Sequence, residues 1–122
     1  ILILGNTTDI YSSKVIRSSM GALFHMPFIK SDRFQDCQKY TSDFNKIGTF
    51  LDIESDFVSD EKEKKMIFLG NEANGLRNDL KNFIDCNYRI RSKSTFDSLN
   101  VSVAAGIILN NIFNYMEDIR CS

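Results

Sequence analysis

The strongest structural signal in this chain is the stretch Asp97-Ser98-Leu99-Asn100-Val101-Ser102-Val103-Ala104-Ala105-Gly106-Ile107, where polar residues run directly into small and branched apolar ones. This pattern predicts a helix whose first turn uses Ser98 or Asn100 to cap the unpaired backbone amides or to hydrogen-bond a ligand. The small residues behind them would let another backbone approach closely. A capped, buried helix without any ligand fits the pattern equally well. The rest of the chain must distinguish between these two interpretations.

Size and composition indicate one folded domain. A chain of 122 residues has room for a single hydrophobic core, and its 43% hydrophobic and 25% charged residues are ordinary globular values. The net charge of −1 gives no overall positive field, so any RNA binding would depend on local patches. No apolar run is long enough to span a bilayer, and the first residues lack the basic flank of a signal peptide. We therefore expect an intracellular protein without a membrane partner.

The cysteines and the start of the chain add two expectations. Cys37, Cys86 and Cys121 are widely spaced, and His25 is the only histidine that could join them in a metal site. This spacing predicts free thiols in a reducing compartment and no bound metal. The chain opens directly on an apolar strand pattern at Ile1 without an initiating methionine, so we expect a piece of a longer protein.

Strand and helix patterns alternate along the chain. Strands are expected at residues 1–4, 28–29, 47–51, 66–69 and 87–90, and helices at about 12–24, 31–45, 77–83 and 98–116. This order predicts an α/β fold with a mostly parallel sheet and helices on both faces. In such sheets ligands gather at the carboxyl ends of the strands, where Gly5, Thr49 and the segments 70–76 and 91–100 fall.

The loop Gly70-Asn71-Glu72-Ala73-Asn74-Gly75 follows the clearest buried strand. Its glycines and backbone amides are suited to cradling a phosphate, as in an unrelated nucleotide-binding α/β domain, but it lacks the lysine and hydroxyl residue of a P-loop. The pair Asn74-Gly75 is also typical of a simple tight turn. Glu72 must be solvated, paired or used to fix a neighbouring loop. A nucleotide-binding interpretation leaves residues 98–107 unexplained.

Two stretches taken together resemble the SpoU (TrmH-type) RNA ribose 2′-O-methyltransferases of the SPOUT superfamily. Leu69–Leu76 resembles the second motif of the family, Ser98–Ile107 resembles the third, and Tyr11–Pro27 resembles the segment between the first and second motifs. The first motif, with an asparagine and the arginine thought to activate the ribose hydroxyl, would precede Ile1 and is absent. The resemblance therefore implies that residues 1–122 are a single SpoU domain lacking its first strand and helix, and inactive by itself.

The resemblance also implies a fold, a cofactor and partners. The fold is an α/β domain with a C-terminal deep trefoil knot, an exception to the general absence of knots. The cofactor is S-adenosylmethionine, held largely by backbone groups. The partners are tRNA or rRNA and a second copy of the chain, with the knotted regions facing each other and Gly106 and the apolar last helix as dimer surface. The implied cofactor site comprises Gly48, Thr49, Leu69, Gly70, Asn71, Glu72, Ile90, Ser98, Leu99 and Asn100.

Methyl transfer to a ribose 2′-hydroxyl is an in-line displacement, so the protein mainly positions donor and acceptor and eases loss of a proton, without a metal. We expect Glu72, Ser98 and Asn100 to be the catalytic residues, which organise the motif loops and the target nucleotide. A positively biased patch of Arg89, Arg91 and Lys93, near Arg77 and Lys81, would contact RNA phosphates together with Arg17. Solvated surface is the simpler interpretation of these charges.

The chain also departs from the family pattern. It has Ile90-Arg91-Ser92 and Ser94 where the family has Ile-Pro-Met and a glycine, although the acidic residue before the serine is kept as Asp97. With the missing first motif, this departure supports an alternative function, a non-catalytic SPOUT-like module that dimerises or binds RNA without turnover. Binding of S-adenosylmethionine would distinguish an enzyme from an unrelated domain.

Overall fold

The computed structural model describes residues 1–54, 64–71, 73–90 and 99–120. These residues form two compact units, residues 1–42 and residues 43–122, and each unit has its own parallel sheet. The prediction of an α/β fold with parallel strand pairing is therefore confirmed. A single domain over residues 1–122 and a trefoil knot remain predictions.

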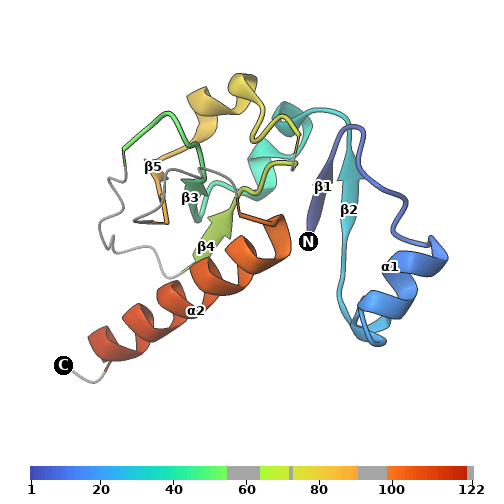
Figure 1. Cartoon of the computed structure of the whole chain (residues 1–122). Coiled ribbons are helices and arrows are strands. Elements are labelled where there is room, and N and C mark those ends of the chain that lie inside the picture. Colours follow the sequence, from blue (N-terminus) through green and yellow to red (C-terminus); the bar gives the residue numbers. More distant parts are fainter. Residues whose placement is uncertain (55–63, 72, 91–98, 121–122) are drawn as a thin grey trace. The chain divides into compact units, whose positions relative to one another are not determined.

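The first unit contains a strand, helix, strand crossover, drawn in blue in Figure 1. Strand β1 (Leu2–Leu4) pairs in parallel with β2 (Ile29–Ser31). Between them lie the helix α1 (Ser13–Ser18) and the 3-10 turn η1 (Ala22–His25). Parallel strands need such a crossover, because a hairpin can only connect antiparallel strands.

Helix α1 is shorter than the predicted helix over residues 12–24. It begins as expected, with the Ser12 side chain accepting a hydrogen bond from the Val15 amide. It ends because Met20 and Gly21 have φ values of 48° and 86°, in the left-handed region. A right-handed helix cannot continue through two such residues. The chain therefore turns before η1.

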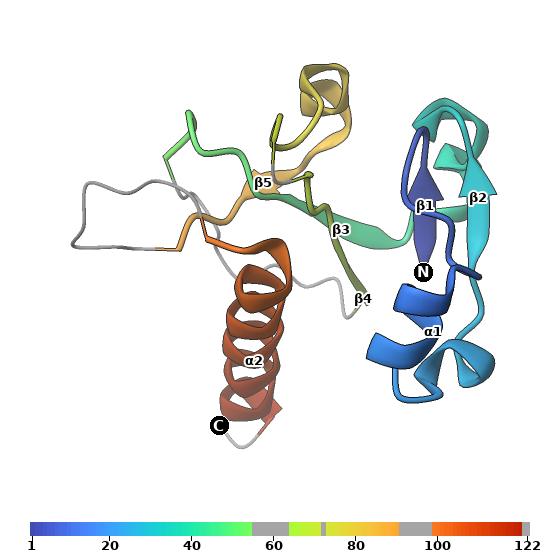
Figure 2. The same ribbon diagram turned by 45° about the vertical axis from the view of Figure 1, so that its right-hand side comes forward.

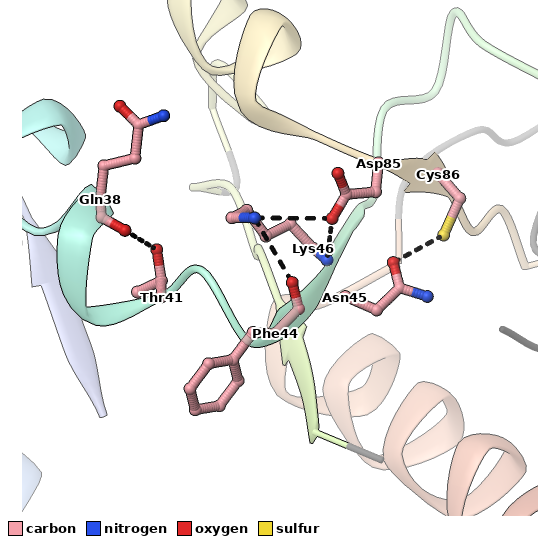
Figure 3. Close-up of polar contacts among 7 residues, drawn as sticks. All are labelled: Gln38, Thr41, Phe44, Asn45, Lys46, Asp85 and Cys86. Carbon is pink, nitrogen blue, oxygen red and sulfur yellow. Dashed lines mark hydrogen bonds and ion pairs between the residues drawn. The ribbon is translucent and has the colours of Figure 1, made fainter. Parts of the chain in front are cut away.

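The predicted helix over residues 31–45 is wrong. The structure has two short 3-10 turns there, η2 (Phe34–Asp36) and η3 (Gln38–Tyr40). Thr41 ends η3 and is buried, and its hydroxyl donates a 3.0 Å hydrogen bond to the Gln38 carbonyl (Figure 3). The chain then enters a strand at Phe44, so tertiary pairing of the strand overrides the local helical pattern.

The second unit is built on the central strand β3 (Phe44–Gly48). It pairs in parallel with β4 (Lys64–Ile67) on one side and with β5 (Cys86–Asn87) on the other. Strand β3 therefore begins three residues before the strand predicted at 47–51, and β4 begins two residues before the strand predicted at 66–69. Strand β5 is shorter than the strand predicted at 87–90. In the register, Ile47 lies opposite both Ile67 and Cys86.

The two faces of this sheet are covered by different segments. Ile47 is fully buried and packs with Ile108 and Ile112 of helix α2 (Val101–Arg120). On the opposite face of β3, a Cβ atom added to Gly48 would lie 3.0 Å from Cγ2 of Ile84, just after the 3-10 helix η4 (Asn78–Phe83). Figures 1 and 2 show η4 and α2 on opposite sides of the sheet.

Polar contacts attach the start of β5 to β3. The Asp85 carboxylate accepts a 2.8 Å hydrogen bond from the Lys46 backbone amide, and Lys46 Nζ lies 3.6 Å from the same oxygen (Figure 3). The Asp85 amide donates in turn to the Lys46 carbonyl at 2.8 Å. On the α2 face, Cys86 Sγ donates to Oδ1 of buried Asn45 at 3.8 Å. These contacts extend the short pairing between β3 and β5.

Helix α2 covers most of the helix predicted over residues 98–116, but it begins three residues later, at Val101. Among the described helices, none combines the length and the apolar character needed to cross a membrane.

Candidate functional site

The parallel pairing of β3, β4 and β5 brings three connecting loops to one edge of the sheet. Gly48 lies opposite Asn87, and Ile47 lies opposite Ile67, so the chain leaves all three strands at the same level. Figure 2 shows that α2 also starts on the side toward which β3 runs. Ligands of α/β proteins bind at this carboxyl edge. The structure thereby brings together the predicted site residues Gly48, Thr49, Leu69, Gly70, Asn71 and Ile90.

Hydrogen bonds hold the beginnings of these loops in fixed positions. Thr49 Oγ1 donates a 2.8 Å hydrogen bond to the Phe68 carbonyl, and the Phe68 amide donates to the Ile47 carbonyl at 2.9 Å. On the other side, the Tyr88 amide donates to the Gly48 carbonyl at 2.8 Å. The Thr49 hydroxyl thus continues the connection between β3 and β4 beyond the last strand residue.

The loop after β4 folds back on its own first glycine. A Cβ atom added to Gly70 would lie 2.1 Å from the Gly75 carbonyl carbon and 2.2 Å from the Leu76 nitrogen. Gly75 has a φ of 66°, in the left-handed region that glycine adopts most readily. The two glycines of the motif therefore have distinct structural roles, close backbone approach and a left-handed turn.

Asn71 organises the interior of the same loop. The Asn71 amide donates a 3.1 Å hydrogen bond to the Gly75 carbonyl, and the Gly75 amide donates a 2.9 Å hydrogen bond to the Asn71 carbonyl. Its Oδ1 accepts 2.8 Å hydrogen bonds from the amides of Ala73 and Asn74. Because this oxygen already stabilises the turn, we expect any ligand contact of Asn71 to come mainly from its backbone. Glu72, between these residues, lies outside the described residues.

Asn100 is the N-cap of α2. Its Oδ1 accepts a 2.9 Å hydrogen bond from the Ser102 amide and another from the Ser102 hydroxyl at 2.5 Å. The expectation that Ser98 or Asn100 caps this helix is confirmed for Asn100, while Ser98 lies outside the described residues. The cap leaves the Nδ2 amide as the group through which Asn100 could reach a ligand. The neighbouring Leu99 side chain is 49% exposed.

The segment after β5 is anchored to α2. Tyr88 and Ile90 pack partly buried against the core of Ile47 and α2. The Tyr88 hydroxyl also accepts a 2.8 Å hydrogen bond from Asn111 Nδ2 on that helix. Sequence reasoning placed Ile90 at the site and did not single out Tyr88 or Asn111.

The expected basic patch is less positive than its sequence suggests. The Arg77 guanidinium donates two hydrogen bonds to the Asp79 carboxylate. These bonds lower the pKa of Asp79 and raise the pKa of Arg77. Similarly, the 2.7 Å hydrogen bond from Lys81 lowers the pKa of Asp52.

The remaining predicted RNA contacts belong to different parts of the chain. Arg89 lies 3.8 Å from Glu54, a weaker and exposed ion pair. Arg17 belongs to the first unit, where its Nε donates to the Ser13 carbonyl. Arg91 and Lys93 lie outside the described residues, so their contribution to RNA binding remains a prediction.

Sequence reasoning missed one prominent residue at this edge, Asn87. It is 3% exposed, and its side chain makes three hydrogen bonds to the backbone of the loop that follows β3. The available signal was a carboxamide at the start of a predicted strand, since a polar group that becomes buried in a sheet needs partners. No cluster of three His, Cys, Asp or Glu side chains suited to a metal occurs within the described ranges.

The parallel sheets define an α/β protein, and the loops at the carboxyl ends of β3, β4 and β5 form a candidate ligand-binding edge. Residues 1–110 match the SpoU rRNA Methylase family. This chain belongs to that family.

Similar proteins agree with this assignment. The chain is 34% identical over 105 residues to a Mycoplasma pneumoniae protein called "Uncharacterized tRNA/rRNA methyltransferase MG252 homolog". The matched region covers 80% of this chain and 43% of that protein. It is 27% identical over 117 residues, 89% of its length, to the 23S rRNA (uridine(2479)-2′-O)-methyltransferase of Streptomyces viridochromogenes, covering 41% of that enzyme. The chain thus spans less than half of these relatives.

A solved structure shows the same fold. The chain superposes with a TM-score of 0.78 and 26% identity on the SpoU methyltransferase AviRb from Streptomyces viridochromogenes in complex with the cofactor AdoMet. The match covers 89% of this chain and 44% of AviRb.

Proposed function

We propose that this chain is the cofactor-binding part of an enzyme that transfers a methyl group from S-adenosylmethionine to a ribose 2′-hydroxyl of tRNA or rRNA. The observation that carries the proposal is the shared carboxyl edge, where the 2.8 Å bond from Thr49 to the Phe68 carbonyl joins two of the family's loops. Membership of the SpoU family and the AdoMet complex of AviRb support it.

The chemistry of this edge fits the cofactor. The side chains of Leu69 and Leu99 are 40% and 49% exposed and offer apolar contact to an adenine ring. Backbone groups of Gly48, Thr49, Gly70 and Asn71 would hold the polar parts, since the Asn71 side-chain oxygen is engaged in its own loop. Ile90, Glu72 and Ser98 complete the proposed cofactor site by resemblance.

When bound, S-adenosylmethionine supplies the methyl group as a sulfonium. The protein has to align the ribose hydroxyl with that group and assist loss of the hydroxyl proton. We assign the alignment to Glu72, Ser98 and Asn100, with Asn100 acting through Nδ2 because Oδ1 caps α2. The resemblance places the residue that activates the hydroxyl in the first motif, which these 122 residues do not contain. We therefore expect the chain by itself to bind cofactor without turnover.

The proposal includes a homodimer formed through the knotted region. Helix α2 buries Ile108 and Ile112 against its own sheet. A second apolar stripe of α2 lies about half a turn away, and it is exposed at Val103 and Leu109 with Gly106 between them. An exposed apolar stripe opposite a buried one supports pairing of α2 with a second copy.

Calorimetry on the whole protein with S-adenosylmethionine, followed by transfer of a labelled methyl group to tRNA and rRNA, tests the function. We expect binding and ribose methylation that is lost when the 2′-hydroxyl is replaced by hydrogen. Absence of binding would exclude the methyltransferase. Binding without transfer to any RNA would instead support a non-catalytic module.

A further inference from the structure

The backbone that follows β3 is held by a buried side chain instead of a neighbouring strand. Asn87 Oδ1 accepts a 2.8 Å hydrogen bond from the Phe50 amide. Asn87 Nδ2 donates to the Phe50 carbonyl at 3.0 Å and to the Ile53 carbonyl at 2.9 Å. A carboxamide is the side chain that can satisfy an amide and two carbonyls at once.

These bonds explain why β3 ends where it does. Gly48 is the last residue of β3 and lies opposite Asn87 in the register. Beyond it, Phe50 bonds to the Asn87 side chain rather than to a strand. Asn87 and Phe50 are 3% and 4% exposed, so the two bonds between them lie away from competing water, and the bond to Ile53 is partly buried. The Asn87 side chain therefore holds the loop 49–53 at both Phe50 and Ile53.

Lys81 of η4 holds the same loop from its outer side. Lys81 Nζ lies 2.7 Å from Asp52 Oδ2 and 5.1 Å from the centroid of the Phe50 ring. Together with the bond from Thr49 to Phe68, the loop is attached to β4, β5 and η4. A loop with three attachments is preorganised, and a preorganised site loses less entropy when it binds a ligand.

We infer that Asn87 is a positioning residue for the methyl donor. Its side chain acts through the loop that follows β3, by holding the backbone of Phe50 so that Gly48 and Thr49 present their backbone in the binding geometry. This inference rests on the proposed function, because the loop is assigned to S-adenosylmethionine there. It adds a specific requirement: cofactor affinity depends on the Asn87 carboxamide, and the intrinsic affinity for RNA does not.

The substitution Asn87→Asp tests this requirement with little change in volume. The new carboxylate retains an acceptor for the Phe50 amide, but it cannot donate to the Phe50 and Ile53 carbonyls and would place a negative charge beside them. Asn82→Asp is the matched control, since it makes the same chemical change at an exposed position of η4 in the segment leading to β5.

The measurement is calorimetry of the whole protein with S-adenosylmethionine, which reports the dissociation constant and the fraction of competent sites separately. We expect Asn87→Asp to weaken binding about tenfold or more with an unchanged competent fraction. The control should keep the dissociation constant of the unmodified protein, and both variants should retain its RNA affinity in the absence of cofactor. Acidification should partly restore binding by Asn87→Asp, because a protonated carboxyl can donate one hydrogen bond.

Other outcomes would overturn the inference. A reduced competent fraction with an unchanged dissociation constant would show that Asn87 serves stability alone. If Asn87→Asp does not fold, Lys81→Met provides the test, because it releases the exposed side of the loop and should weaken cofactor binding about threefold. Unchanged affinity in a folded Lys81→Met would then reject positioning through this loop. Failure of the unmodified protein to bind would refute the proposed function instead.

Discussion

Thr49 Oγ1 and the Phe68 carbonyl are joined by a 2.8 Å hydrogen bond that connects the residue after β3 to the residue after β4. Both residues come directly after a paired strand, so the bond prevents the two loops from separating where the sheet ends. The relative position of these loops matters because ligands of α/β sheets bind between such loops. A single hydroxyl thus links the edge geometry to the proposed site.

Thr49→Val keeps the shape of the side chain and removes this donor. The Phe68 carbonyl would lose its partner, so we expect unfolding to become easier by about 1 kcal/mol and cofactor binding to weaken severalfold. Denaturant unfolding and calorimetry measure the two effects. Thr49→Ser retains the hydroxyl and should bind nearly normally; equal behaviour of both variants would contradict a role for this bond.

Gly70→Ala introduces a methyl group where the backbone of residues 75–76 already lies, 2.1 Å from the Gly75 carbonyl carbon. Backbone cannot yield as a flexible side chain can, so the loop must open. We expect a loss of about 1–3 kcal/mol in the free energy of unfolding and a loss of cofactor affinity. A crystal structure of the variant with the loop unchanged would disprove this explanation of the glycine.

Asn100 has two separable roles, a helix cap through Oδ1 and a proposed substrate contact through Nδ2. Asn100→Ala removes both, so stability should fall by about 1 kcal/mol and RNA methylation should fall as well. Asn100→Asp keeps a good cap but lacks the amide donors, and we expect normal stability with reduced methylation. Full activity of either variant in the whole enzyme would remove Asn100 from the mechanism.

Gly106→Ala tests the exposed stripe of α2. No atom outside its own stretch of helix lies within 4 Å of the added methyl group, so within one chain alanine should stabilise the helix by up to about 1 kcal/mol. In the proposed dimer the same methyl group would meet the second copy. We expect a higher unfolding temperature of the monomer and weaker self-association by sedimentation. Unchanged association of a dimeric protein would place the interface elsewhere.

The pair between Lys81 and Asp52 predicts a pH dependence. Its hydrogen bond lowers the pKa of Asp52 in the folded protein, so the stabilisation is complete above the unfolded pKa of about 4 and is lost as pH falls through the lower folded value. Unfolding temperatures of the unmodified protein and Asp52→Asn should differ slightly at pH 5–8 and converge in acid. The difference should be small because the pair is exposed, and it should vanish in Lys81→Met.

Some elements of this chain follow from local sequence patterns, and others do not. The polar-to-apolar sequence at residues 98–107 correctly predicted a helix and named Asn100 as one of two possible caps, because capping depends on residues adjacent in the chain. The pattern over residues 31–45 predicted a helix where the structure has two 3-10 turns and the start of β3. That error arose because strand pairing with β4 and β5 is a long-range contact that local periodicity does not contain.

The sequence by itself determined the α/β class, the parallel pairing expected of alternating strands and helices, and the two motifs through which the chain resembles the SpoU family. These features depend on local periodicity, capping and glycine placement, which are all encoded over a few consecutive residues. Only the tertiary structure decided that Thr49 bonds to Phe68 and that Asn87 holds the backbone of Phe50. Those partners are 19 and 37 residues apart, and only the packing of the sheet brings them together.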